Sequence, residues 1–176
     1  MDPGWRPALH ALVPFAGRRR LMREPPNGIT LLRLVFIAFC ASIVFFGVVA
    51  ASLHLDTDTS LVPVYALAVY AVVVTLMWGR FDPPLDGTSE VALYVSYRAR
   101  MLLRIAFAEL IAVPAFFLRV VTGPPWIYFF GGSYALLWLI VMGPTRRGFQ
   151  SDHTALDAKG CNISVVVALS GLGRDD

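Results

Sequence analysis

The chain has 176 residues, of which 57% are apolar and only 15% are charged. Soluble domains contain about 45–50% apolar and about 25% charged residues, so this composition excludes an ordinary soluble domain and indicates a membrane protein. The net charge is +3, but the basic residues flank long apolar runs and do not gather in one soluble region, so we expect no nucleic acid partner.

Four apolar runs are long enough to cross a bilayer, which takes about 20 residues in a helix. The runs are continuous, whereas the strands of a membrane barrel alternate apolar and polar residues, so all four are predicted to be helices. The sequence therefore predicts an all-α membrane protein with a bundle of four transmembrane helices, at about 34–53, 61–78, 101–118 and 126–142.

The first apolar run follows the basic sequence GRRRLMR, as the core of a cleaved signal peptide would. A signal core has about 7–15 apolar residues, and residues 34–53 exceed that length, so a retained helix is favoured. The chain then divides into a basic cytoplasmic arm (1–33), a transmembrane bundle (34–143) and a cytoplasmic tail (144–176).

The distribution of Lys and Arg predicts the orientation of the helices, because these residues accumulate in cytoplasmic loops. The arm contains six Lys and Arg residues, the segment 80–100 contains three and the tail contains four. The turns after the first and third predicted helices together contain one, Arg119. Both termini and the middle loop are therefore predicted to be cytoplasmic. Fourteen of the fifteen basic residues are Arg, and this usage is similar to that of bacteria with GC-rich genomes, so we expect the plasma (inner) membrane of a bacterium.

The middle loop begins with turn residues, Asp82-Pro83-Pro84. Thr88 or Ser89 is then expected to cap a helix that enters the membrane near Arg98.

The tail is predicted to form two short cytoplasmic helices. Pro144 is expected in the first turn of one helix, Gly160 at its end, and Asn162 as the cap of the second. The apolar stretch 163–169 is too short to cross a bilayer, and its three consecutive valines leave a strand open as the alternative.

Four polar residues lie close to the midpoints of the four runs: Ser42, Tyr70, Glu109 and Tyr134. Each is within two residues of its midpoint, hence within about 3 Å of a common depth at 1.5 Å per residue. We therefore predict one polar layer inside the bundle, in which Ser42 or a tyrosine hydroxyl contacts the Glu109 carboxyl group.

The charge of Glu109 depends on its partner. An ionised Glu at the bilayer centre costs about 2.5–3.5 kcal/mol, and protonating a free Glu at pH 7 costs about 3.7 kcal/mol. Arg104 lies five residues earlier, on another face of the helix, and we expect it to reach the cytoplasmic headgroups together with Arg100. Glu109 is therefore either a hydrogen-bonding link between helices or a proton or ion site.

The sequence RIAFAELIAVP around Glu109 resembles the acid-bearing helix of the proteolipid (c) subunit of rotary ATP synthases. That subunit is a hairpin of two helices whose polar cytoplasmic loop contains Arg and Pro, as Arg80 and Pro83-Pro84 do here. The resemblance covers about sixty residues, over the second and third predicted helices, and implies that Glu109 binds a proton or sodium ion.

The sequence contains no phosphate-binding loop, nucleophile motif or zinc pattern, so we expect no enzymatic activity, no metal and no cofactor. The predicted function is that of a non-enzymatic, accessory or interaction protein of the membrane. Its expected partners are the lipid bilayer and either another membrane protein or further copies of the chain. The alternative is a proton- or ion-handling component that uses Glu109.

Overall fold

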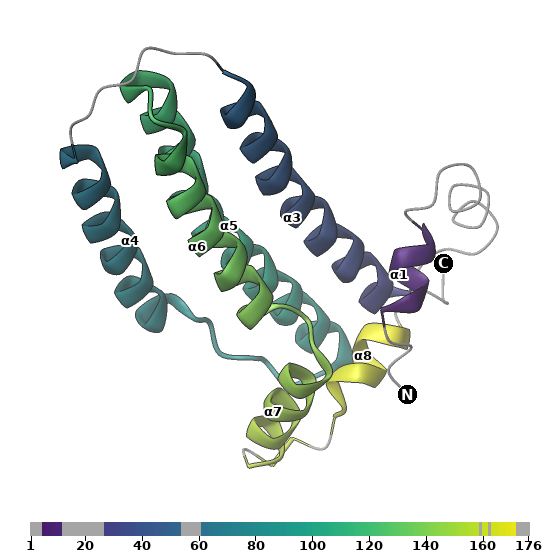
Figure 1. The fold of residues 1–176 in the computed structure, drawn as a ribbon. Coiled ribbons are helices and arrows are strands. Elements are labelled where there is room, and N and C mark those ends of the chain that lie inside the picture. The colour runs from purple at the N-terminus through teal and green to yellow at the C-terminus, as the bar shows by residue number, and fades with distance from the viewer. Residues whose placement is uncertain (1–4, 12–26, 54–60, 159, 162, 172–176) are drawn as a thin grey trace. The chain divides into compact units, whose positions relative to one another are not determined.

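The computed structural model describes residues 5–11, 27–53, 61–158, 160–161 and 163–171, and every regular element in these ranges is an α-helix (Figure 1). The predicted all-α class is therefore confirmed. The helices are α1 (Arg6–Ala11), α3 (Gly28–Ser52), α4 (Val62–Phe81), α5 (Glu90–Thr122), α6 (Pro125–Met142), α7 (Arg146–Asp157) and α8 (Val165–Gly171).

Three helices of the described part of the chain, α3, α5 and α6, are long and apolar enough to cross a membrane. The sequence predicted four, and the remaining predicted helix corresponds to α4, whose apolar stretch Val62–Trp78 is shorter. The chain thus has the long apolar helices of a multi-pass membrane protein, with three candidate spans.

Two helices begin where a side chain caps their free amide groups. α3 starts at Gly28, inside the predicted arm, because the Asn27 side-chain oxygen accepts a hydrogen bond from the Thr30 amide at 3.0 Å. α5 starts at Glu90, because the Ser89 hydroxyl accepts one from the Ala92 amide at 3.1 Å. Ser89, one of the two predicted caps, therefore begins a helix that continues without interruption through the third apolar run.

The chain separates into two compact units, which we describe one at a time. The bundle unit contains residues 38–82 and 102–142, and the composite unit contains the described residues of 1–37, 83–101 and 143–176.

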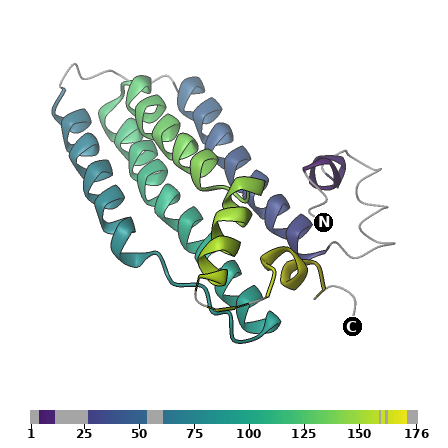
Figure 2. The same ribbon diagram turned by 90° about the horizontal axis from the view of Figure 1, so that it is seen from below.

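Within the bundle unit, the helices lie side by side in both views (Figures 1 and 2), and α4 packs against α6. The side of α4 that is buried carries Leu67, Ala71, Val74 and Trp78, at the three- and four-residue spacing of one helix face. Gly131 of α6 allows close packing on α5, since a Cβ atom there would lie 2.4 Å from the Cβ of Ala115. This agrees with the small residues that membrane helices use at their contacts.

The composite unit joins three segments that are far apart in the sequence. Gly28 at the start of α3 lies against the backbone of Leu169 and the ring of Tyr94, because an added Cβ would approach both within 3 Å. The ring of Tyr97 stacks on Phe149 of α7 with centroids 5.5 Å apart. Gly87 of the middle loop lies equally close to Cys161 of the tail. Each segment therefore contacts both of the others.

The buried Arg33 side chain connects the first and last of these segments. Its guanidinium group lies 5.0 Å from the centre of the Trp5 ring and 5.8 Å from that of Phe149, and one of its nitrogens is 3.5 Å from the carbonyl oxygen of Pro144. Aromatic faces attract a cation that has lost its water, so the cluster compensates in part for the burial of this charge.

The tail forms the two short helices that its sequence predicts. Thr145 caps α7 by accepting a hydrogen bond from the Gly148 amide at 3.2 Å, so Pro144 precedes the cap and is not in the first turn. Gly160, with φ of 80°, ends the helix as predicted. The three valines begin α8, so the helix is found and the strand alternative is wrong. Asn162, the predicted cap of α8, lies outside the described residues.

Candidate functional site

Glu109 and Ser42 form the contact that their common depth predicts. The hydroxyl of Ser42 donates to the Glu109 carboxylate across 3.4 Å, and it also lies 2.8 Å from the carbonyl oxygen of Phe39 in its own helix. Among the described residues, no Lys or Arg lies within salt-bridge distance of Glu109. The partly buried carboxyl group therefore has a hydroxyl partner and no cationic one.

Tyr128 of α6 is a neighbour of this pair that the sequence analysis did not single out. Its buried hydroxyl donates to the carbonyl of Ile43 at 2.5 Å, one residue after Ser42. Gly47 and Gly132 make room for the Tyr128 ring, because an added Cβ would lie 3.2 or 3.0 Å from the ring. In the sequence, these two glycines were the feature that could have indicated a bulky side chain packed against them.

The two tyrosines of the predicted layer lie elsewhere. The Tyr134 hydroxyl is 2.7 Å from the hydroxyl of Thr75, which in turn donates to the carbonyl of Ala71. Tyr70 is 37% exposed on α4 and forms no hydrogen bond with the described residues. The four residues thus separate into the Ser42–Glu109 contact, the Thr75–Tyr134 contact and the outward-facing Tyr70, since a common depth does not fix the rotation of each helix.

The two arginines predicted at the cytoplasmic interface have different partners. Arg104 donates to the carbonyl of Met142 at 3.2 Å, at the carboxyl end of α6, and lies 3.9 Å from the Asp82 carboxylate. A cation is favoured there because the last carbonyls of a helix are partly negative. Arg100 forms a 3.0 Å ion pair with Asp152 of α7. Arg104 therefore holds helix ends together in the bundle unit, and Arg100 attaches the tail within the composite unit.

Arg119 is buried like Arg33, although in the sequence it counted only as a loop charge. It is 2% exposed. Its guanidinium donates to three carbonyl oxygens, those of Ala50 at 3.1 Å, Leu53 at 2.5 Å and Gly123. These carbonyls belong to the last turn of α3 and the residues that follow α3 and α5, where a helix leaves acceptors without an amide partner. Arg119 therefore satisfies the ends of two helices at once.

The described part of the chain contains arginines that bond helix ends and one partly buried acid, Glu109, but no arrangement of side chains that is typical of a catalytic site. No group of three or more His, Cys, Asp or Glu residues there could hold a metal ion. Comparison of the chain with protein-family models, with curated proteins and with solved structures finds no match.

Replacing Arg119 with Gln should destabilise the bundle unit, because Gln presents two donors in place of the guanidinium fork and leaves helix-end carbonyls without partners. We expect the free energy of unfolding to fall by at least about 2 kcal/mol, since each hydrogen bond to a charged group contributes about 1.5–3 kcal/mol. Unfolding of the purified protein in mild detergent measures the change. Arg80→Gln, at an exposed site, is the control and should have little effect; equal stability of the two variants would contradict the role of Arg119.

Proposed function

We propose that the chain is a multi-pass protein of the plasma (inner) membrane of a bacterium, with four spans and with both termini and the middle loop in the cytoplasm. The composite unit supports this topology. Its three segments contact one another, as segments on one side of the membrane would. A chain that crosses through α3 must then cross again before residue 83, and α4 is the helix between them.

The length and surface of α4 agree with a fourth span. Twenty residues extend about 30 Å at 1.5 Å per residue, which matches the hydrocarbon thickness of about 30 Å. The side chains that α4 exposes are almost all apolar, and Val62 and Leu76, which lie fourteen residues apart, are both 72% exposed. Such a surface suits lipid and is costly in water.

We propose further that the protein is non-enzymatic and acts as an accessory or interaction protein through its composite unit. The observation that supports this role is that three separate segments form one compact unit, which the proposed topology would place in the cytoplasm. The Arg100–Asp152 ion pair and the Arg33 cluster hold these segments together. This unit exposes Val91 and Val95, each more than half accessible, with Arg98 on the same helix face. An apolar stripe beside a basic residue fits a protein partner that offers apolar and acidic side chains.

Placing an acid on this stripe should weaken partner binding without disturbing the fold. We expect Val95→Asp to reduce partner recovery from mild-detergent extracts at least tenfold, because an interface buries the unpaired charge. Ala155→Asp on the exposed side of α7 is the matched control and should leave recovery unchanged. If neither Val95→Asp nor removal of residues 144–176 alters the recovered proteins, the proposed interaction role is wrong.

A proton- or ion-handling role is the second candidate, and the surroundings of Glu109 favour it. The acid lies in the middle of α5 with a serine hydroxyl as its hydrogen-bonding partner. Without a cation nearby to hold the charge, the ionised and the neutral forms of Glu109 are close in cost, so the acid can exchange its proton.

A hydrophobic carbodiimide distinguishes an exchangeable acid from a fixed structural one. If Glu109 exchanges its proton within the bilayer, the carbodiimide should modify the native protein increasingly as the pH falls, because the reagent attacks the protonated carboxyl group. Glu109→Gln keeps the shape and the capacity to bond Ser42 but removes the reactive group, so mass spectrometry should find no modification at position 109. Absence of modification in the native protein at every pH would contradict the ion-handling role.

A further inference from the structure

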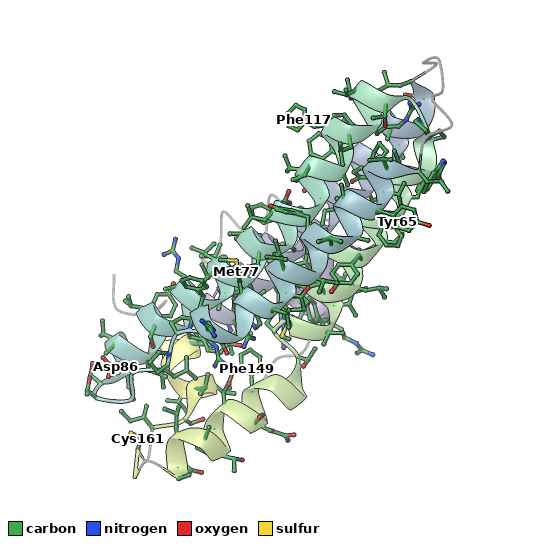
Figure 3. All side chains as sticks on the ribbon, turned by 90° about the vertical axis from the view of Figure 1, so that its left-hand side faces the viewer. Tyr65, Met77, Asp86, Phe117, Phe149 and Cys161 are labelled. Atoms are coloured by element: carbon green, nitrogen blue, oxygen red, sulfur yellow. The ribbon has the colours of Figure 1, made fainter. Side chains whose placement is uncertain are left out.

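One side of α4 forms a shallow hollow, and none of the other described helices contributes to it. It is lined by Val62, Tyr65, Ala66, Val69, Tyr70 and Val73. In Figure 3, which looks towards α4, Tyr65 projects from the helix away from the bundle. The buried side of α4, with Leu67 and Ala71, is a different face of the helix.

The spacing of the lining residues is that of a helix contact surface. Residues 62, 65, 66 and 69 form one four-residue diamond at i, i+3, i+4 and i+7, and residues 66, 69, 70 and 73 form the next. When two helices pack, a side chain of one enters such a hole of the other. Ala66 belongs to both diamonds and is the smallest member, so it leaves the hollow that a side chain of a facing helix would fill.

Tyr70 gives the face a polar requirement as well as a shape. It is at the centre of the apolar stretch Val62–Trp78, about 12 Å along the helix from either end. Its hydroxyl forms no hydrogen bond with the described residues. A hydroxyl at that depth meets no water, and hydrocarbon offers it neither donor nor acceptor, so a partner with a polar group at the same depth is favoured.

We propose that this face of α4 binds the same face of a second copy of the chain, side by side and in the same orientation. The inference rests on the proposed four-span topology. Two copies inserted with one orientation are related by a twofold axis along the membrane normal, which brings the two Tyr70 residues to equal depth. A tyrosine hydroxyl both donates and accepts, so two of them satisfy each other. Each copy also offers the other the hole around Ala66.

Disulfide trapping in purified, reconstituted protein tests this contact. In a background with Cys40→Ala and Cys161→Ala, Val69→Cys should form a covalent dimer under mild oxidation. Leu110→Cys, at the same depth on the exposed side of α5, should remain a monomer. Filling the hole with Ala66→Trp should lower dimer formation by Val69→Cys at least tenfold, and Ala106→Trp, at an exposed site of α5, should not. Tyr70→Phe should weaken association about threefold, as expected for one hydrogen bond between membrane helices.

If Val69→Cys forms no more dimer than Leu110→Cys, the proposed contact is wrong. A water-soluble maleimide that cannot cross the bilayer separates this result from a failure of the topology. Position 69 should not react when α4 spans the membrane. Reaction there would mean that α4 is in water, and both the fourth span and the dimer would then be overturned.

Discussion

The contact among three segments that are far apart in the sequence is the constraint on which the proposed membrane topology depends. The composite unit is assembled from the start of α3, the segment 83–101 and the tail, and each contacts the others. Contacts of this kind require an even number of crossings between successive segments. In the proposed topology α3 with α4, and α5 with α6, form two hairpins, an arrangement that would put thirteen of the fifteen basic residues on one side of the membrane.

Several polar groups of the bundle unit find hydrogen-bond partners within that unit, as a membrane interior favours. Arg119 and Arg104 donate to carbonyls at helix ends, Tyr128 to the carbonyl of Ile43, and Tyr134 pairs with Thr75. Among these groups Glu109 differs, because a serine hydroxyl at 3.4 Å is a weak partner for a carboxylate. Because its partner is weak, Glu109 fits both of the roles considered for it, a hydrogen-bonding link between helices and a site that exchanges a proton.

The sequence predicted the elements of the fold more fully than the contacts between them. Apolar runs and capping residues predicted the helices, including the Ser89 cap and the end of α7 at Gly160. Depth along the helix predicted the Ser42–Glu109 contact, but rotation depends on packing against neighbours, so Tyr70 and Tyr134 could not be assigned partners. Arg119 could not be distinguished from a loop charge, because two of its three carbonyl partners, Ala50 and Leu53, become neighbours only when α3 and α5 are packed.

The accessibility of two positions near opposite ends of α5, measured in intact cells, tests the central claim most directly. With Cys40 and Cys161 replaced by Ala, single cysteines are introduced at Val95, in the middle segment, and at Val121, an 80% exposed residue near the end of α5. A membrane-impermeant maleimide added outside should label position 121 in intact cells and position 95 only after permeabilisation. Labelling of position 95 from outside, or of neither position until the cells are opened, would contradict the arrangement of two hairpins with their basic segments in the cytoplasm.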